Sequence, residues 1–519
     1  MESRDAIITL PDSILICHQL ISELLGTLKD KERLIGQLKH RLDLLLRSRY
    51  GGKSEKINPE ELLPQLRELF SLPVPQAKAL SEPVKTETIT YQRPVKGHGR
   101  KELPAHLPRR QKIYDLEESQ KVCSCCGEKL ERIGADKAEQ LNYQPASLYI
   151  MEHIRYKYAC RHCQETIITA DKGLYEPIEK GLAGAGLLAQ VIAGKYADHC
   201  PLYRMEDIFR RQGVEISRST MCDWMAQSAD ILRPLYDLMK KRVLVSKVLH
   251  TDDTPVQVQD HDRDKTRTGR LWIYLGDGNN PYDVYDYTAN RSRAGPDEFL
   301  GDFQGYLQAD AFGGYDGIYV TKPVKEVLCN AHARRKFYDA RKSDPLLSHT
   351  ALAYYKRLYD IEREIKDLSS GEKRQVRQDK SVPIFREFQA WLEGITDTQA
   401  LPKSPIRQAI NYCLNNWQAL LRYTDDGDLS IDNNAAERRM RPIAIGRRNW
   451  LFFGSDKGGR TGAVLFSLTQ SAKRHGLNIF AYIEDVLTRL PNIPVSKISE
   501  LLPDEWLKRR HNPNPPEQN

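Results

Sequence analysis

The sequence predicts a multidomain α+β protein. At 519 residues the chain is too long for one hydrophobic core, so several units are expected. Apolar residues make up 40% and charged residues 29% of the chain, as is typical of globular proteins. Segments with a helical hydrophobic period and segments with strand-type apolar runs occupy different parts of the chain, so both kinds of element are expected in separate regions.

Composition and the start of the chain limit where the protein can work. The formal net charge of +8 is a mild basic bias that a solvated surface alone could produce. The start, MESRDAIITLPDS, lacks the basic and apolar regions of a signal peptide, and there is no run of about 18 apolar residues that could span a membrane. Ten cysteines in such a chain indicate a reducing compartment. We therefore expect a cytoplasmic protein with no membrane partner.

Residues 12–48 follow a heptad repeat, which predicts a coiled-coil helix within residues 10–50. Eight of the ten a and d positions are aliphatic, and Lys31 at a d position could set the register or the oligomeric state. The a positions are Ile14, Ile21, Leu28, Ile35 and Leu42, and the d positions are Cys17, Leu24, Lys31, Leu38 and Leu45. The seam predicts a homo-oligomer, most simply a dimer. An amphipathic helix packed on its own protein is the alternative.

A basic, proline-rich linker is predicted for residues 51–112. Six prolines recur between residues 73 and 108, and seven Lys or Arg residues lie between Arg93 and Lys112 against one acid, Glu102. A flexible basic arm of this kind usually follows phosphate groups of nucleic acid, and a solvated linker without a partner is the alternative.

Four cysteines predict a zinc ribbon within residues 113–172. Cys123 and Cys126 form one Cys-x-x-Cys pair, and Cys160 and Cys163 form a second pair after 33 intervening residues. Two such pairs supply four thiolates for one tetrahedral Zn²⁺, and a site with four protein ligands is structural. A redox disulfide pair and a metal-free segment are the alternatives. Five other cysteines are scattered and are expected to be mostly core residues: Cys17, Cys200, Cys222, Cys329 and Cys413.

Residues 180–240 are predicted to form a helix-turn-helix-like DNA-binding region. GLAGAGLLAQVIAGKYAD and PLYRMEDIFRRQG each have a helical pattern, and the second ends at a glycine. Ser217 can cap a third helix, so that Arg218, Ser219 and Thr220 lie at its exposed start. Short polar and basic residues in that place suit phosphates and base edges. A helical hairpin that binds no ligand is the alternative.

The stretch 245–345 has the pattern of the first part of an α/β catalytic domain. Strand-type runs VSKVLHTDDTPVQVQD, GRLWIYLGD and PYDVYDYT come first, followed by a helix near residues 293–301 and then by GYLQAD and KEVLCN. Three strands, a helix and further strands match the order of an RNase H-like sheet. Residues 346–424 are predicted as an α-helical insertion, residues 425–475 as the last part of the domain, and residues 476–519 as C-terminal helix and tail.

Three acidic residues mark the candidate active site of this domain. Asp252 in HTDDTPVQV and Asp310 in GYLQADAFGGY end or follow strand-type runs, and Glu437 opens the Arg-rich helical segment DNNAAERRMRPIAIGRRNW. Carboxylates from two strands and one helix can hold two divalent cations roughly 4 Å apart, an arrangement that serves cleavage and joining of phosphodiesters. After Glu437, GRRNWLFFGSDKGG is predicted to be a turn-rich loop.

Several strings, spread over nearly the whole chain, occur together in a fixed order. They are RYGGKSEKI, the two Cys-x-x-Cys pairs, KYADHCPLYRMEDIF, HTDDTPVQV, LQADAFGGYDGIY, CNAHARRKF and DNNAAERRMRPIAIGRRNWLFFGS. Because it contains these strings in this order, the chain resembles the transposases of the insertion sequence 66 family, of the large TnpC type. The ordered set is far more specific than any one string.

The resemblance implies a DDE recombinase, named for an Asp-Asp-Glu triad that falls on Asp252, Asp310 and Glu437. Asp253 stands where the family usually has Glu, and it is expected to cap or stabilise a turn. The implied cofactors are two Mg²⁺ or Mn²⁺ ions per active site. The implied reactions are hydrolysis that exposes a 3′-OH at the element end and transesterification of that end into target DNA. Three nearby acids are expected to be surface residues: Asp283, Asp286 and Asp316.

The resemblance also implies partners. They are double-stranded DNA, as the inverted repeats of the element ends and as target, and small accessory proteins of the same element. The implied location is the bacterial cytoplasm, at the nucleoid.

Other residues near Glu437 are given supporting roles. A basic helical run beside a phosphate-handling site is expected to hold the DNA backbone, with a solvated face as the alternative. This run contains Arg438, Arg439, Arg441, Arg447 and Arg448. The cluster Trp450, Phe452 and Phe453 is expected to be core more than a platform for base stacking. For Cys329-x-x-His332, packing or orientation of the histidine is expected more than metal binding.

Two other functions remain open from the sequence. An RNase H-like nuclease would need neither zinc ribbon, helix-turn-helix nor coiled coil, so these extra regions argue against it. A DNA-binding regulator derived from an inactive transposase would be free to lose any one carboxylate, so the intact triad favours an enzyme.

Overall fold

A computed structural model describes residues 14–50, 157–159, 167–169, 176–178, 181–260, 265–396 and 400–511, together with residue 148. The chain divides into two compact units, one formed by residues 1–79 and 155–519 and the other by residues 80–154. Every helix and strand given below belongs to the first unit. The predicted linker and all four cysteines of the predicted zinc ribbon lie outside the described residues.

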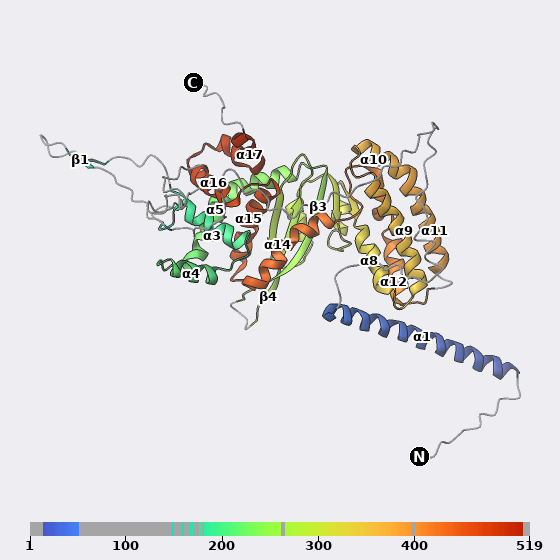
Figure 1. Cartoon of the computed structure of the whole chain (residues 1–519). Helices are drawn as coiled ribbons and strands as arrows, with labels where there is room; N and C mark the ends of the chain where they lie inside the picture. The colour runs from blue at the N-terminus through green and yellow to red at the C-terminus, as the bar shows by residue number, and fades with distance from the viewer. Residues whose placement is uncertain are drawn as a thin grey trace, which may run out of the picture. The chain divides into compact units, whose positions relative to one another are not determined.

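The helix predicted from the heptad repeat is present as α1 (Ile14–Tyr50), a single helix drawn in blue in Figure 1. Its eight aliphatic a and d residues are each at least 51% exposed. One contact to another element is a hydrogen bond of 3.2 Å from Gln37 Nε2 to the carbonyl of Lys403. An apolar stripe left open along one helix agrees with a seam that is covered by another chain.

A short antiparallel hairpin flanks the second cysteine pair. Strand β1 (Lys157–Ala159) pairs with β2 (Ile167–Thr169), with Ala159 opposite Ile167. The segment that joins these strands contains Cys160 and Cys163 and lies outside the described residues.

Three helices follow where the sequence predicts them: α3 (Ala185–Tyr196), α4 (Leu202–Arg211) and α5 (Arg218–Val243). Gly213 has φ of +82°, the left-handed conformation that glycine adopts without steric cost, and it turns the chain after α4. Ser217 caps α5 as predicted, since its side chain accepts a hydrogen bond of 3.1 Å from Thr220 N. The buried face of α5, which includes Trp224, packs in the same hydrophobic core as the sheet.

The sheet has five strands in the order β5-β4-β3-β6-β7, and a short strand β8 also pairs with β3. The first three strands are antiparallel, and β3, β6 and β7 are parallel. The elements are β3 (Val248–Val258), β4 (Arg267–Leu275), β5 (Asp283–Thr288), α6 (Ala294–Leu300), β6 (Gly305–Ala309), α7 (Asp316–Thr321) and β7 (Val324–Leu328). The predicted sequence of three strands, a helix and two strands is confirmed.

Helix α15 (Asp456–Arg474) covers the edge strand β5 and completes its hydrogen bonding. Ser467 Oγ accepts from Tyr285 N at 2.8 Å, and Ser471 Oγ accepts from Asp283 N at 3.0 Å. An open strand edge invites pairing with other chains, and these two serines satisfy backbone donors that β4 does not reach. The chain ends with α16 (Ile479–Arg489), the 3-10 helices Leu490–Asn492 and Val495–Leu501, and α17 (Pro503–His511).

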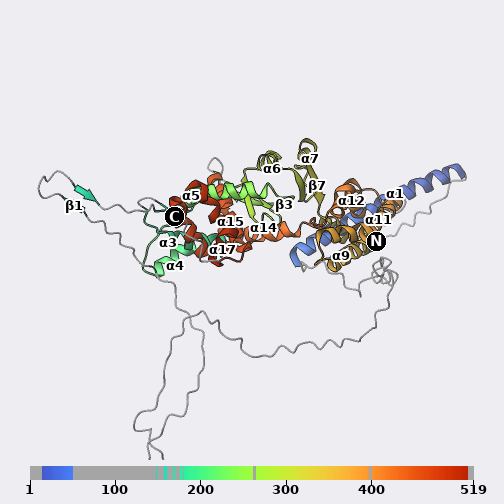
Figure 2. The same cartoon turned by 90° about the horizontal axis from the view of Figure 1, so that it is seen from above.

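The residues predicted as an α-helical insertion are helical, and their hydrophobic core also includes residues of the sheet. Figure 2 shows α9, α11 and α12 together, and their apolar residues form one cluster with α8 and with Val327 and Leu328 of β7. The elements are α8 (Asn330–Ala340), α9 (Pro345–Glu364), α10 (Ser370–Val376), a π-helix (Arg377–Ser381), α11 (Val382–Thr396), α12 (Pro405–Asn415), α13 (Trp417–Leu421) and a 3-10 helix (Arg422–Asp425).

The prediction of a turn-rich loop after Glu437 is wrong. Helix α14 (Asn434–Trp450) continues through GRRNW, β8 (Phe452–Phe453) then pairs with β3, and α15 starts at Asp456. Leu451, with φ of +64°, makes the turn between the helix and the strand. The partner strand β3 holds this two-residue strand, so its own sequence carries little signal.

Two further observations concern the cysteines and the membrane. Cys329 and Cys413 are buried as predicted, but Cys222 is exposed, because it lies on the outward side of α5. No helix among the described residues combines the length and the apolar character needed to cross a membrane.

Candidate active site

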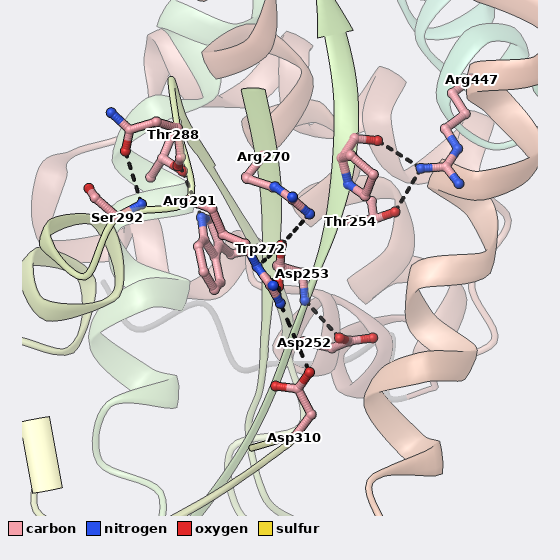
Figure 3. A network of polar contacts seen from close by, with 12 residues as sticks. Asp252, Asp253, Thr254, Arg270, Trp272, Thr288, Arg291, Ser292, Asp310 and Arg447 are labelled. Atoms are coloured by element: carbon pink, nitrogen blue, oxygen red, sulfur yellow. Dashed lines mark hydrogen bonds and ion pairs between the residues drawn. The ribbon is translucent and has the colours of Figure 1, made fainter. Parts of the chain in front are cut away.

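Parallel pairing of β3 and β6 brings two predicted site residues to neighbouring positions. Leu249 pairs with Leu307 and His250 with Gln308. Continuing this register by two residues sets Asp252 opposite Asp310, which directly follows β6. Neighbouring strands lie roughly 5 Å apart, so the two carboxylates are within reach of a shared divalent cation. Both side chains are drawn in Figure 3, below the middle of β3.

Helix α14 brings Glu437 to the same place. Its N-cap residue, Asn433, donates from Nδ2 to the carbonyl of Thr251 at 2.8 Å and accepts from His250 Nδ1 at 3.0 Å. These bonds fix the start of the helix to β3 beside Asp252. Glu437 lies in the first turn of α14, where the positive end of the helix dipole favours a carboxylate.

The electrostatic environment of the two aspartates is unfavourable for a negative charge. Burial raises the pKa of Asp252 to about 7, and repulsion from Asp310 and Glu437 adds to this effect. Burial also raises the pKa of Asp310, while His332 and Arg291 oppose that shift. A site that holds several acids close together with little solvent gains from a divalent cation, which removes the repulsion.

Asp253 has a different environment from Asp252, although both lie on β3. Its carboxylate is 3% exposed and forms ion pairs with Arg270 at 2.9 Å and with Arg291 at 2.7 Å. Figure 3 shows both arginines directed at Asp253, and Arg291 also lies 3.9 Å from Asp310. Because two guanidinium groups already occupy the Asp253 carboxylate, Asp252 is the better candidate for a metal ligand.

A second group of possible metal ligands adjoins the first. Single ligand atoms of Cys329, His332 and Glu437 all lie within 4.8 Å of one another, and His332 Nε2 is 3.7 Å from Glu437 Oε1. The Cys329 thiol is buried and accepts a hydrogen bond of 3.1 Å from Asn433 N, and burial raises its pKa to about 12. Thiol sulfur and imidazole suit softer transition metals, whereas a set of carboxylate oxygens suits Mg²⁺, so Asp252, Asp310 and Glu437 are the better match for Mg²⁺.

Two of the arginines predicted to hold DNA have partners within the fold. Arg447 Nη1 donates to Thr254 Oγ1 at 2.8 Å and to the carbonyl of Pro255 at 2.7 Å. Arg439 forms an ion pair of 3.1 Å with Asp283. Both arginines thereby attach α14 to the sheet, which explains their presence without DNA.

The other three arginines lie on one exposed side of α14. Arg438, Arg441 and Arg448 are exposed, and Ile445 between them is 52% exposed. At 100° per residue these positions fall on one stripe of the helix, beside the direction of Glu437. A basic stripe therefore leads away from the candidate site along the helix surface.

Of the three acids expected at the surface, one is buried and one is half-buried. Asp283 is 0% exposed and forms ion pairs of 3.1 Å with Arg439 and 3.0 Å with Arg474. Asp286 is half-buried, and burial raises its pKa to about 6. Only Asp316, at the start of α7, is exposed as expected. Long-range arginine partners make burial of Asp283 tolerable, and no local pattern reveals them.

The aromatic cluster after α14 is divided between core and surface. Phe453 is 5% exposed, and its ring lies 4.6 Å from that of Trp450. Phe452 is 44% exposed. The expectation of a core role is therefore confirmed for Phe453.

The start of α5 is arranged as the sequence predicts. Arg218 and Ser219 are exposed and Thr220 is half-buried, while Met221 and Trp224 fix the helix in the core. Contact of these residues with DNA stays a prediction.

Family models match most of the chain. The model described as "Transposase IS66 family" matches residues 180–461, which contain the whole candidate site. The chain belongs to the IS66 transposase family. A model for the zinc-finger binding domain of the IS66 transposase matches residues 120–164, the IS66 C-terminal element matches residues 467–503, and a model described as "Transposase C of IS166 homeodomain" matches residues 37–111. The family indicates an insertion-sequence transposase that binds DNA, and its zinc-finger domain indicates a zinc-binding site.

Similar proteins occur in Sinorhizobium fredii (strain NBRC 101917 / NGR234). The uncharacterized protein y4hP is 32% identical over 90% of this chain and 88% of its own length. The uncharacterized protein y4jD is 32% identical over 91% of this chain and 95% of its own length. The similarity of this IS66 transposase to these relatives thus extends over most of each chain.

Three residues outside the predicted triad shape the site of this IS66 transposase, and of these only His332 was singled out from the sequence. Asn433 binds the start of α14 to β3, His332 lies beside Glu437, and Arg291 joins Asp253 to Asp310. Asn433 and His332 lie within the strings DNNAAE and CNAHARRKF, so proximity to those strings was a usable signal. Arg291 lies in the loop after β5, and nothing in that segment distinguishes it from a solvated residue.

Proposed function

We propose that this protein cuts and joins DNA strands at the ends of its own insertion sequence. In the proposed reaction, hydrolysis of a phosphodiester frees a 3′-OH at the element end. That 3′-OH then attacks a phosphodiester of target DNA and displaces a 3′-oxygen of the target. The observation that carries the proposal is the convergence of Asp252, Asp310 and Glu437 through β3, β6 and α14.

The topology supports an RNase H-like class for the catalytic domain. Three antiparallel strands are followed by two parallel strands, with the central strand β3 carrying Asp252. Figure 1 shows α14 alongside β3, so the helix that carries Glu437 reaches the strand that carries the first aspartate. A central strand, its parallel neighbour and one helix are thus the three carriers of the acidic residues.

Two Mg²⁺ or Mn²⁺ ions would be held by Asp252, Asp310 and Glu437. The donor set fits them, since all three side chains offer carboxylate oxygens and burial with mutual repulsion raises the pKa of Asp252. When bound, such ions activate an attacking oxygen and neutralise charge on a leaving oxygen. The hydrogen bond from Asn433 to Thr251 fixes the start of α14 to β3, and α14 carries Glu437 as the third carboxylate.

Three surfaces would hold DNA in this proposal. The exposed stripe of Arg438, Arg441 and Arg448 would bind backbone phosphates next to the site. Arg218 and Ser219 at the start of α5 would contact an element end. The basic linker, which lies outside the described residues, would follow further phosphates. Such a substrate places the protein at the nucleoid.

Two ends of one element must be handled together, and α1 offers a means of pairing two chains. Its exposed a and d residues would form a parallel two-stranded coiled coil with a second copy. One structural Zn²⁺ on Cys123, Cys126, Cys160 and Cys163 would hold the ribbon between this helix and the catalytic domain. Small accessory proteins of the same element are further proposed partners.

The proposal is tested with duplex DNA that carries the terminal repeat of the element. Incubation with Mg²⁺ or Mn²⁺ is expected to release a 3′-OH at the repeat and to join it to a second duplex. Asp252→Asn, Asp310→Asn and Glu437→Gln are each expected to abolish both steps, while DNA binding persists.

A matched control is Asp316→Asn, which changes an exposed acid near the site and is expected to leave cleavage unchanged. If the wild-type protein binds the repeat but cuts no strand under these conditions, the enzyme proposal is wrong and a regulator is indicated. Cleavage without joining would instead indicate a nuclease.

A further inference from the structure

Arg291 lies in a loop, and hydrogen bonds fix both its side chain and the loop itself. It lies between β5 and α6, and its Nε and Nη2 groups donate to Asp253 Oδ1 at 3.0 and 2.7 Å. The loop itself is fixed, since Thr288 Oγ1 donates to Asn290 O at 2.7 Å and Ser292 N donates to Asn290 Oδ1 at 3.0 Å. These contacts are visible in Figure 3.

The two guanidinium groups beside Asp253 carry more positive charge than one carboxylate needs for neutralisation. Arg270 already donates to Asp253 Oδ2 at 2.9 Å, and one guanidinium neutralises one carboxylate. Arg291 therefore brings an additional positive charge into a half-buried place. Its side chain is 36% exposed against 22% for Arg270, so the additional charge lies on the solvent side.

Nη2 of Arg291, which donates to Asp253, also lies near Asp310 of the candidate active site. Nη2 lies 3.9 Å from Asp310 Oδ2, and the guanidinium carbon lies 4.0 Å from the centre of the Phe312 ring. Among the described residues, none accepts a hydrogen bond from Nη1. The edge formed by Nε and Nη2 is thus fixed by Asp253 and one face of the group by Phe312, while Nη1 keeps its hydrogens for a further acceptor.

We propose that Arg291 binds a non-bridging oxygen of the DNA phosphate that is cut or joined, and that Asp253 is the positioning residue that holds it there. This inference rests on the proposed function and names the contact that the site makes with its substrate. A guanidinium suits this task because it presents donors in a rigid plane that matches phosphate oxygens. It also attracts a phosphate to a site that three carboxylates would otherwise repel.

The test compares how tightly the protein binds two terminal-repeat duplexes. Ca²⁺ replaces Mg²⁺, so that the assay measures binding and not cleavage. One duplex has a natural phosphate at the cleavage position, and the other has a neutral methylphosphonate there. Arg291→Ala is expected to weaken binding of the natural duplex by about 10-fold or more and to leave binding of the methylphosphonate duplex unchanged. Arg291→Lys is expected to restore part of the preference for the charged phosphate.

Arg270→Gln is the matched control, because Arg270 shares Asp253 with Arg291, whereas the ion pair with Asp310 is made by Arg291. It is expected to lower stability and to keep the preference for the natural phosphate. In Mg²⁺, Arg291→Ala is expected to slow single-turnover cleavage by about 100-fold or more, the effect of removing one preorganised donor. Asp253→Asn is expected to slow cleavage as well, and Asp253→Asn with Arg291→Ala is expected to be no slower than Arg291→Ala alone.

Several outcomes would overturn the inference. An Arg291→Ala protein that retains the wild-type preference for the charged phosphate has no contact with that phosphate. Additive effects of the two substitutions would show that Asp253 does not act through Arg291. Failure of the proposed function gives a different result: the wild-type protein would cut no DNA in Mg²⁺, while the comparison in Ca²⁺ would still report on Arg291.

Discussion

Replacement of Asp252 by asparagine should stabilise the protein in the absence of Mg²⁺. Asparagine keeps the shape of the side chain and can still accept the hydrogen bond of 2.8 Å that Asp253 N donates. It removes the negative charge that burial and the neighbouring carboxylates disfavour. Asp252→Asn, which should abolish the proposed chemistry, should thus raise the free energy of unfolding. This is expected for a cation site whose carboxylates repel one another when no cation is bound.

The magnitude follows from the shift in pKa of Asp252. Its value rises from 3.8 to about 7, a difference of about three units. At about 1.4 kcal/mol per unit the upper limit is about 4 kcal/mol, and relaxation around the charge brings the expected gain to about 1–3 kcal/mol. Because the folded state binds the proton more tightly than the unfolded chain, the charge destabilises the fold fully above pH 7. The gain should shrink towards zero as the pH falls from about 7 to about 4.

Urea unfolding at several pH values, followed by circular dichroism, measures this effect. Buffers should be freed of Mg²⁺ with a resin, because a strong chelator in solution would also remove zinc. Asp316→Asn, at an exposed position, is the control and should change stability by less than about 0.5 kcal/mol. If Asp252→Asn lowers stability at pH 8, or if its gain does not vary with pH, the argument from carboxylate repulsion is wrong.

Three further predictions concern the fold and the assembly. Gln308→Leu should lower the free energy of unfolding by about 2–4 kcal/mol, since this buried side chain forms hydrogen bonds with the backbone of Ser430 and Asp432. In the same urea assay Gln257→Leu, at an exposed position, is the control and should change the free energy of unfolding little. Leu24→Lys with Leu38→Lys should lower the mass found by sedimentation, because both residues lie on the exposed seam of α1, whereas Lys29→Ala off the seam should leave it unchanged. Cys123→Ser should remove about one zinc ion per chain in elemental analysis, while Cys125→Ser should retain it, and equal zinc content in the two variants would contradict the assigned ligands.

Elements with a local signal could be predicted from the sequence. The heptad of α1, the cap at Ser217 and the strand-type run of β3 each depend on residues within one segment. Propensity and hydrophobic period act over such distances, so the sequence alone carries them. The order of the strands and the first helix along the chain was predictable for the same reason.

Features that depend on distant partners could not be predicted. Strand β8 exists because β3 offers it an edge, and the segment before it remains helical to Trp450. Asp283 is buried because Arg439 and Arg474 neutralise it from α14 and α15. An isolated acid has no local property that distinguishes these outcomes from exposure at the surface.

The candidate site was predictable in part. The strings around Asp252, Asp310 and Glu437 identified three acids, but strings cannot say how near the carboxylates lie. The register of β3 with β6 supplies that information, as does the attachment of α14 by Asn433. Arg291 escaped prediction because its role comes from three partners on two distant segments, β3 and the chain after β6.

The central claim is that three carboxylates from β3, β6 and α14 form one divalent-cation site. The most direct measurement is anomalous diffraction from crystals of the protein grown with Mn²⁺. The account predicts an anomalous peak with oxygens of Asp252, Asp310 and Glu437 at roughly 2.0–2.6 Å. A peak held by Cys329, His332 and Glu437 alone, with Asp252 and Asp310 free of metal, would contradict it.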